Sequence, residues 1–164
     1  MGYSDWVNRF STTLVGGWIA RKMAPYDPLV YRATGGRLTL SIVKTIPQLA
    51  LTTIGRKSGR SRAIQLGCLA DGDDFIVVAT NFGQRHHPAW SYNLMANPAA
   101  TVEVDGRVVP VVAERLSNEE RDALWPRLDE VIPQFAVYRS RTDRDIRVFR
   151  LRPVRKELGM GRGK

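Results

Sequence analysis

Short apolar segments separated by turn residues make up most of the chain after residue 38. Two of the connections, Asp71-Gly72-Asp73 and Asp105-Gly106, have the composition of tight β-hairpin turns. About six strands at short spacing, joined mainly by hairpins and interrupted by helices, predict a mainly β protein of the α+β class, built as a small antiparallel barrel. The predicted strands are residues 49–54, 63–70, 75–80, 101–104, 107–113 and 146–151.

Helix signals interrupt the strands in two places. Residues 88–96 begin with a proline at a plausible first helical position and end before an Asn-Pro pair. Ser117 and Glu120 have the spacing of a capping box, which opens a second helix. Pro126 should bend or shorten that helix, and Pro110 should place its strand at an edge or a bulge. The side chains expected to face inward from the second helix are Ala123, Leu124, Leu128 and Val131.

The first 37 residues have a helical period. Trp6, Phe10, Leu14 and Trp18 recur every four residues with cations nearby, which predicts an amphipathic helix. This helix could pack on its own domain, or it could lie on an anionic bilayer with its tryptophans at the interface. We therefore expect three parts: an N-terminal helical extension (residues 1–37), a barrel domain (residues 38–156) and a disordered basic tail (residues 157–164).

Charge and the length of apolar runs restrict the partners and the location. The chain carries 25 Lys and Arg against 16 Asp and Glu, a formal charge of +9, which favours an anionic partner such as nucleic acid, an acidic lipid surface or a polyanionic cofactor. No nucleic-acid-binding motif accompanies the charge, so nucleic acid is not expected. Apolar runs of about eighteen residues are absent, and the N-terminus is unlike a signal peptide. The cytoplasm is the expected compartment, with attachment to the inner face of the cell membrane as an open alternative.

The segment LTTIGRKSGRSR, residues 51–62, contains the clearest candidate for anion binding. Glycines bound a turn between two predicted strands, and glycine allows backbone conformations that point amides outward. A phosphate or a carboxylate could bind there, although an ordinary basic hairpin turn has the same composition. The residue order is not that of a Walker loop, so a nucleoside triphosphate is not implied. The four cations around the turn are Arg56, Lys57, Arg60 and Arg62.

A second candidate is residues 81–90, NFGQRHHPAW, which follow the most apolar strand. Asn81 offers an amide group, and Trp90 could form one wall of a ring pocket beside the basic turn. Trp90 could equally be a core anchor in a plain strand–helix connection. The adjacent His86 and His87 do not suit one metal ion, so no metal is expected, and no nucleophile elbow is present. The chain therefore suits a bound cofactor that carries the chemistry, or a binding protein without chemistry.

Several motifs follow one another along nearly the whole chain. They are YRATGGR at 31–37, LTTIGRKSG at 51–59, NFGQ at 81–84, HPAW at 87–90, NL at 93–94, ANP at 96–98, YRSRT at 138–142, Arg144, Ile146 and LRP at 151–153. In this combination the chain resembles the deazaflavin-dependent nitroreductase family of actinobacterial split β-barrel oxidoreductases.

The resemblance implies a split β-barrel of the FMN-binding type with flanking helices. It also implies coenzyme F420, an 8-hydroxy-5-deazaflavin with a phosphate-linked oligoglutamate tail. Motif matching implies that Arg56, Lys57, Ser58 and Arg62 hold the phosphate and the tail. The residues implied to border the deazaflavin ring are Ala63, Ile64, Gln65, Leu66, Val78, Ala79, Thr80, Asn81, Ala89, Trp90, Tyr92 and Asn93.

The implied reaction is hydride transfer from the reduced coenzyme to an electrophilic small molecule such as a quinone, an activated enone or a nitroaromatic compound. Tyr138 is the candidate hydrogen-bond donor to the acceptor oxygen, although a packed tyrosine at a helix end is the alternative. Gly67 stands where relatives often carry a bulky aromatic residue, so we expect it to widen the acceptor side. Phe135 and Ile132 replace tyrosines of some nitroreductases. We therefore predict a quinone or enone reductase rather than a dedicated nitroimidazole reductase, with Gly67, Phe135 and Tyr138 at the substrate.

Two other functions are compatible with the same residues. A deazaflavin- or flavin-binding carrier or storage protein would need the binding site but little turnover. An FMN-dependent oxidase of the wider barrel superfamily could use the basic turn for its phosphate. Fold and cofactor are shared among many activities, so the motifs leave the acceptor and the oligomeric state open.

Overall fold

The computed structural model describes residues 46–154, which contain six strands and three α-helices. The predicted N-terminal helix and the predicted basic tail both lie outside these residues. Within the described range, no helix has the length and apolar character needed to cross a bilayer.

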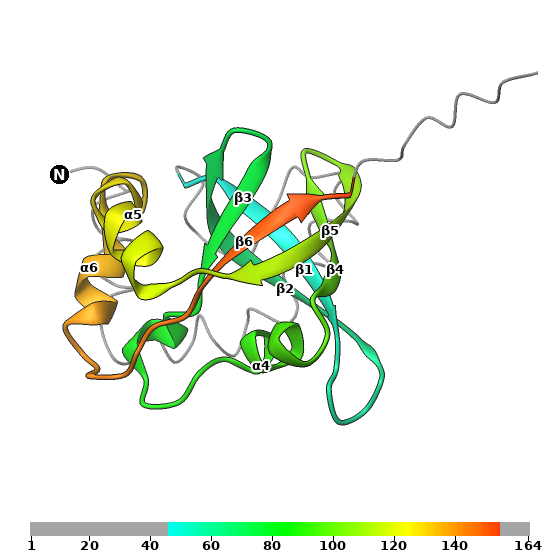
Figure 1. Ribbon diagram of the computed structural model, residues 1–164, viewed down its shortest axis with the longest axis horizontal. Helices are drawn as coiled ribbons and strands as arrows, with labels where there is room; N and C mark the ends of the chain where they lie inside the picture. Colours follow the sequence, from blue (N-terminus) through cyan, green and yellow to red (C-terminus); the bar gives the residue numbers. More distant parts are fainter. Residues whose placement is uncertain (1–45, 155–164) are drawn as a thin grey trace, which may run out of the picture.

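The six strands form one closed antiparallel barrel (Figure 1). Their order around the barrel is β1-β2-β3-β6-β5-β4, and β4 pairs with β1 to close it. The predicted mainly β fold is confirmed, because each predicted strand overlaps an observed one. The strands are β1 (Gln48–Ile54), β2 (Ser61–Asp71), β3 (Asp74–Val78), β4 (Ala99–Val104), β5 (Arg107–Arg115) and β6 (Val148–Pro153).

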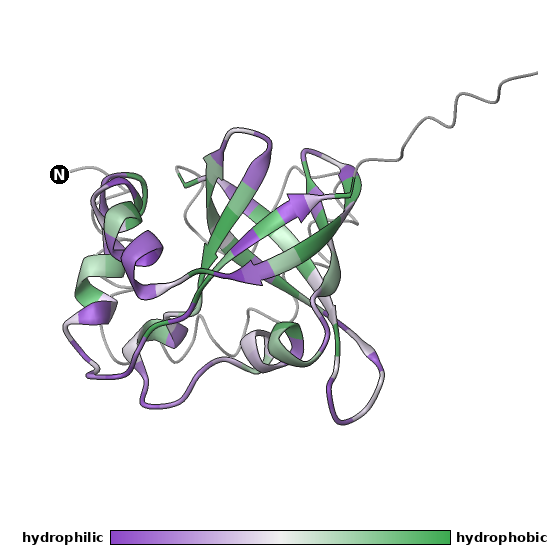
Figure 2. Ribbon diagram, viewed as in Figure 1, coloured by the Kyte–Doolittle hydropathy of each residue, from purple (hydrophilic) through white to green (hydrophobic). Residues whose placement is uncertain are grey.

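Strand β3 is apolar from Phe75 to Val78 because its two faces belong to two cores. Val77 lies in the interior core of the barrel with Phe149, whereas Ile76 and Val78 lie in a second core on the outer face. Burial on both faces removes the alternation of polar and apolar residues that a half-exposed strand shows. In Figure 2, hydrophobic colour is concentrated in the strands, whereas the hairpin turns are mainly hydrophilic.

Helix α5 (Asn118–Val131) covers the second core and begins at the predicted capping box. The Glu120 amide donates to Ser117 Oγ, and the Ser117 amide donates to the Glu120 carboxylate. The helix continues past Pro126, so of the two predicted effects of this proline, shortening is wrong, while bending stays a prediction. Pro126 is exposed, and the carbonyl that it leaves unbonded can be hydrated on that side.

The buried stripe of α5 differs by one residue from the predicted one. Leu124 and Leu128 are buried, and Val131 packs against the same core. Ala123, however, is exposed, and Trp125 is buried instead. At 3.6 residues per turn, the stripe through Leu124 and Leu128 includes position 125 more readily than position 123.

The other helical segments are short. Helix α4 (Ala89–Ala96) agrees with the predicted helix and lies across one end of the barrel (Figure 1), where Trp90 and Leu94 join the interior core. Helix α6 (Gln134–Arg139) and the single 3-10 turn η1 (Asn81–Gly83) were not predicted. Both are too short to produce a recognisable helical period.

The prediction that Pro110 places its strand at an edge or a bulge is wrong, because β5 pairs with both β4 and β6 and its register with β4 runs without interruption through the Thr101–Pro110 pair. Pro110 lies one residue beyond the β5–β6 ladder, which begins at Val111 paired with Pro153. Its carbonyl accepts the amide of Val154 at 2.9 Å. The missing N–H of Pro110 therefore falls at the end of a ladder, where the loss of a donor is tolerated.

Candidate cofactor site

The basic turn, residues 55–62, comprises the loop between β1 and β2 and the first two residues of β2, and the loop is closed by its own backbone. The Gly55 amide donates to the Arg60 carbonyl at 2.8 Å, and the Gly59 amide donates to the Gly55 carbonyl at 2.7 Å. Gly59 has φ +65°, and a Cβ at Gly55 would lie 2.7 Å from Ser58 Oγ. Both glycines are thus needed for this loop shape. Its cationic side chains are all exposed.

Asn93 of helix α4 attaches the basic turn to the barrel. Its Nδ2 donates to Thr53 Oγ1 at 3.0 Å, and its Oδ1 accepts the Arg56 amide at 3.0 Å. Thr53 is 1% exposed and Asn93 is 7% exposed. Asn93 was predicted to line the deazaflavin ring, but in the structure its polar atoms bind the chain itself. It therefore positions the turn.

The cations of the basic turn have no acidic partners among residues 46–154. The nine arginine–carboxylate ion pairs of this range all involve other arginines. A fixed loop with unpaired positive charge attracts phosphate and carboxylate groups. These cations are Arg56, Lys57, Arg60 and Arg62.

The loop after β3 has an unusual backbone. Asn81, Phe82 and Gly83 have φ of 47°, 56° and 76°, in the left-handed region that non-glycine residues rarely adopt. Gly83 tolerates no Cβ, which would lie 2.7 Å from the Tyr138 carbonyl oxygen. Asn81 Nδ2 donates to the His86 carbonyl at 2.9 Å and holds the loop across its width. Strain of this kind persists only where surrounding contacts determine the conformation.

Arg144 supplies most of those contacts. Its guanidinium donates to the carbonyls of Gln84, Ala79 and Thr80 at 3.1, 3.1 and 2.8 Å. Its Nη1 also lies 2.7 Å from His87 Nδ1. Because arginine can only donate, His87 Nδ1 accepts, and the ring proton resides on Nε2. Burial and the nearby arginines lower the pKa of His87 to about 4, so the ring is neutral at pH 7.

Tyr92 of α4 connects this loop to the basic turn. The guanidinium carbon of Arg56 lies 5.0 Å from the centre of the Tyr92 ring, and that of Arg147 lies 4.8 Å from it. The His87 ring meets Tyr92 edge-on at 5.7 Å. The structure thus brings together the basic turn, α4 and the segment before β6.

Several residues predicted to border the deazaflavin ring are covered by the protein itself. The ring centres of Trp90 and Phe149 lie 5.7 Å apart in the barrel interior, so Trp90 has the contacts of a core anchor. Ala79, Ile64 and Leu66 also contact the interior core. Val78 lies in the second core, and Gln65 is buried on β2. Thr80 and Asn81 lie in the strained loop. Three of the predicted residues are at least partly accessible: Ala63, Ala89 and Tyr92.

The residues predicted on the acceptor side lie in the second core. Phe135 and Tyr138 of α6 are 7% and 6% exposed, and Tyr138 meets Phe82 edge-on at 5.6 Å. A Cβ at Gly67 would lie 2.9 Å from Ile132 Cδ1. Ile132 thus lies directly beside Gly67, and the expectation that Gly67 widens the acceptor side stays a prediction.

Three residues of this site had no predicted role. Thr53 could have been noticed, because it is polar at an inward position that follows Leu49 and Leu51 in the alternation of β1. Arg144 belongs to the motifs that carry the resemblance, but sequence alone does not reveal which carbonyls it binds. Arg147 has no sequence signal that separates it from the other arginines.

Comparison with known proteins identifies the family of this chain. Residues 27–153 match the family described as F420H(2)-dependent quinone reductase. The chain belongs to this family. It is 37% identical over 117 residues to a putative F420H(2)-dependent quinone reductase of Mycobacterium tuberculosis, covering 71% of this chain and 98% of that protein. A second quinone reductase of that species is 34% identical over 122 residues, with 73% and 82% covered.

Structural comparison supports the same family placement. A solved structure of an F420-H2-dependent reductase (FDR-A) matches with a TM-score of 0.59 and 36% identity, and covers 64% of this chain and 93% of that one. The family resemblance and the split-barrel fold that were predicted for this chain are therefore confirmed. The basic turn, Asn93, Arg144 and Arg147 all lie within the matched residues.

Proposed function

We propose that this protein transfers a hydride from reduced coenzyme F420 to a quinone. Membership of the F420H(2)-dependent quinone reductase family supports the coenzyme and the reaction. The structural observation that carries the proposal is the basic turn, whose exposed cations have no carboxylate partners in residues 46–154 and whose backbone is tied to α4 through Asn93. A polyanionic tail is the ligand that such a surface favours.

The described residues fit this coenzyme at two places. Arg56, Lys57 and Arg62 would bind the phosphate and the tail, and Ser58 adds a hydroxyl next to them. On the outer face of β2, Gln65 Oε1 is buried and has no hydrogen-bond partner among residues 46–154. A buried carbonyl oxygen of this kind requires an N–H donor, which a deazaflavin ring possesses.

The ring-bordering role of β2, the strained loop and α4 stays part of the proposal. The partly accessible Ala63, Ala89 and Tyr92 would touch the ring. Buried members such as Trp90 and Ala79 would act through the shape of the backbone that they hold. Arg144 keeps the loop carbonyls of Ala79 and Thr80 in fixed directions.

The protein's part in catalysis is positioning. When bound, the reduced coenzyme would supply two electrons and one proton together as a hydride. The basic turn and Gln65 bind and orient it, and the closed barrel end beneath α4 keeps water away from that side. Hydrogen bonding from Tyr138 to the acceptor stays a prediction, and its burial favours the packed-tyrosine alternative.

Titration and turnover test this function. Purified protein should bind coenzyme F420 in preference to FMN, and the reduced coenzyme should be reoxidised by a quinone over many turnovers, faster than by nitroimidazoles. Lys57→Ala should weaken binding by about tenfold, because it removes a charge-assisted contact. The control Arg107→Ala, an exposed arginine in the β4–β5 hairpin, should change nothing. Binding without turnover would indicate a carrier, and preference for FMN would contradict the proposal.

Attachment to a membrane is a separate prediction that concerns residues 1–37. Deletion of the residues before Pro25 should reduce binding of the protein to vesicles that contain anionic lipid, because it removes the tryptophans and cations of the predicted helix. Unchanged sedimentation with such vesicles would refute it. Vesicles of neutral lipid serve as the control.

A further inference from the structure

His87 has one ring nitrogen in use and one that the described chain leaves unused. Its Nδ1 lies 2.7 Å from Nη1 of Arg144. Because arginine can only donate, Nδ1 accepts, and the ring proton is on Nε2. No hydrogen bond within residues 46–154 uses Nε2, yet Nε2 does not belong to the buried unpaired atoms of this range. The Nε2–H is therefore a donor that solvent or a ligand can reach.

The imidazole of His87 lies where the strained loop, α4 and the basic turn meet. The same Nη1 of Arg144 that bonds His87 also donates to the Ala79 carbonyl at 3.1 Å, so His87 is close to the end of β3. Its ring centre is 5.7 Å from that of Tyr92 on α4. Tyr92 in turn contacts the guanidinium of Arg56 in the basic turn. The unused donor thus belongs to the candidate cofactor site.

The surroundings of His87 keep the ring neutral and strengthen its free donor. Burial first, and then the charges of Arg144 and Arg147, lower the pKa of His87 to about 4 against an opposite effect of Asp145. A cationic group that donates to Nδ1 draws electron density from the imidazole, and linked hydrogen bonds polarise one another. The Nε2–H is therefore a stronger donor than that of an isolated neutral histidine, and it suits an oxygen that carries negative charge.

His86, the adjacent histidine, lacks these contacts. Its side chain is exposed, and no hydrogen bond or ring contact of the described chain involves its imidazole. Only its backbone takes part, through the carbonyl that accepts Asn81 Nδ2 at 2.9 Å. The chain contains just these two histidines, so His86 is a matched control for His87.

We propose that the Nε2–H of His87 donates a hydrogen bond to a carbonyl or oxyanion oxygen of a ligand bound beside α4. The assignment rests on the function proposed above, under which two molecules carry such an oxygen. One is the deazaflavin ring. The other is the quinone, whose oxygen gains negative charge as the hydride arrives and then takes a proton from water. Arg144 is a positioning residue in this arrangement, because it fixes the ring proton on Nε2.

NMR of the full chain, labelled with the heavy nitrogen isotope, tests the donor directly. His86→Phe leaves His87 as the only histidine, so both ring nitrogens are assigned. At pH 7 the free protein should show Nε2 protonated and Nδ1 unprotonated. Oxidised coenzyme is added first and a quinone second, a mixture that cannot react. A downfield shift of the Nε2 proton at the first step assigns the oxygen to the deazaflavin, and a shift at the second step assigns it to the quinone.

Three substitutions separate hydrogen bonding from packing at this position. His87→Phe removes both ring nitrogens, His87→Asn keeps an acceptor within reach of Arg144 but no distal donor, and His87→Gln keeps a distal donor. We expect His87→Phe and His87→Asn to lose about tenfold in coenzyme affinity, or in kcat with the quinone, because the donor is lost. His87→Gln should recover part of the loss, and His86→Phe should change nothing.

The contrary results are distinct from one another. A proton on Nδ1, or an Nε2 proton that moves at neither step with ligands bound, would overturn the proposal. Normal function of His87→Asn together with a loss in His87→Gln would mean that His87 acts only as a partner of Arg144, and would overturn it too. A wild type that does not bind the coenzyme would instead overturn the proposed function, and with it the ligand assigned to His87.

Discussion

Two arginine-rich regions lie at opposite ends of β2, and they differ in how their charges are paired. At the start of β2, the basic turn carries cations without carboxylate partners in the described chain. At the end of β2, arginines from α5 and β6 bind the carboxylates around the β2–β3 hairpin. The pairs there are Arg127–Asp71 at 2.9 Å, Arg150–Asp71 at 2.8 Å, Arg150–Asp74 at 3.3 Å and Arg152–Asp74 at 3.8 Å. Arg152 also pairs with Glu114 of β5 at 2.9 Å.

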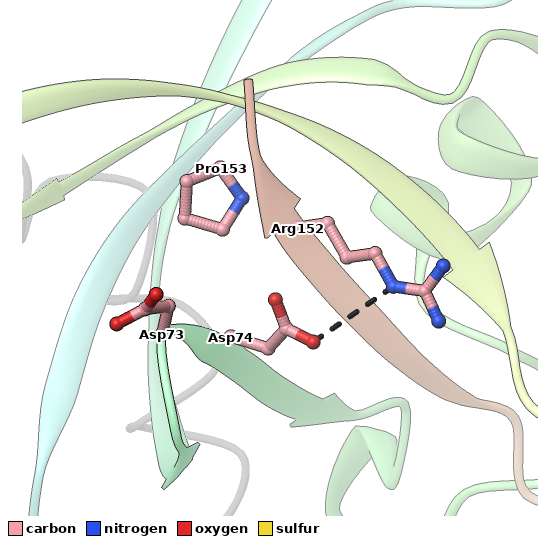
Figure 3. Close-up of a pocket in the computed structure, with 4 residues that line it drawn as sticks. All are labelled: Asp73, Asp74, Arg152 and Pro153. Atoms are coloured by element: carbon pink, nitrogen blue, oxygen red, sulfur yellow. Dashed lines mark ion pairs between the residues drawn. The ribbon is translucent and has the colours of Figure 1, made fainter. Parts of the chain in front are cut away.

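The paired region also has an open pocket, but not an electropositive one. Asp73, Asp74, Arg152 and Pro153 line it, and Arg152 points toward Asp74 (Figure 3). Two aspartates face one arginine there, and the charge of Arg152 is paired with Asp74 at 3.8 Å. The comparison teaches that arginine content alone does not identify a binding site, because a paired arginine joins elements of the fold while an unpaired one remains available to an anionic ligand.

The largest expected effect comes from removing charge at the unpaired region. The double variant Arg56→Gln/Lys57→Gln should weaken binding of coenzyme F420 by about 100-fold, since each charge-assisted contact contributes about 1.5 kcal/mol or more. Its melting temperature should stay within about 2 °C of the wild type, because no described ion pair is lost. Fluorescence titration and thermal denaturation measure the two quantities. A large loss of stability with unchanged affinity would contradict the view that the cations of the basic turn bind a ligand rather than stabilise the fold.

Asn93→Leu tests the attachment of the basic turn to α4. The substitution leaves buried Thr53 Oγ1 and the Arg56 amide without their partner, so the free energy of unfolding should fall by about 2 kcal/mol. Coenzyme affinity should also fall, because the turn is no longer held. Urea denaturation measures the first effect. Thr53→Val removes only one of the two bonds and should reduce stability with a smaller loss of affinity. The same affinity loss in both variants would contradict the positioning role of Asn93.

Arg150→Met tests the paired region and should lower the free energy of unfolding at pH 7 by about 1 kcal/mol. Hydrogen bonds from Arg127 and Arg150 lower the pKa of Asp71 from its ordinary value of 3.8. The stabilisation is therefore complete above pH 3.8 and is lost as the pH falls through the lower, folded-state pKa. The difference between variant and wild type should be constant at neutral pH and shrink in acid. Coenzyme affinity should not change, and a loss of affinity would contradict the division between the regions.

Tyr138→Phe should have the smallest effect. Tyr138 lies outside both regions and is 6% exposed within the second core, so we expect its hydroxyl not to reach the acceptor. Quinone turnover should stay within about twofold of the wild type, which corresponds to less than about 0.5 kcal/mol in the barrier. A reduction of kcat by more than tenfold at unchanged coenzyme affinity would restore the catalytic role predicted from the resemblance.

The elements of the barrel could be predicted because their signals are local. The Asp105-Gly106 turn has φ of 49° and 73°, as its composition indicates, and the capping box of Ser117 and Glu120 forms as spaced. Family resemblance identified the coenzyme class and the reductase family, which the comparisons confirm. Local signals failed where packing decided the outcome, as when α5 continued past Pro126 and the strand that contains Pro110 paired on both sides.

By itself, the sequence determined the strands, the hairpin turns and the concentration of cations in residues 55–62, since each depends on residues close together in the chain. Only the tertiary structure decided which charges are neutralised. Arg150 meets Asp71 across 79 positions, and Asn93 meets Arg56 across 37. Such contacts depend on how the barrel closes and where α4 docks. The same residue type therefore becomes a structural link at one end of β2 and a candidate ligand-binding group at the other.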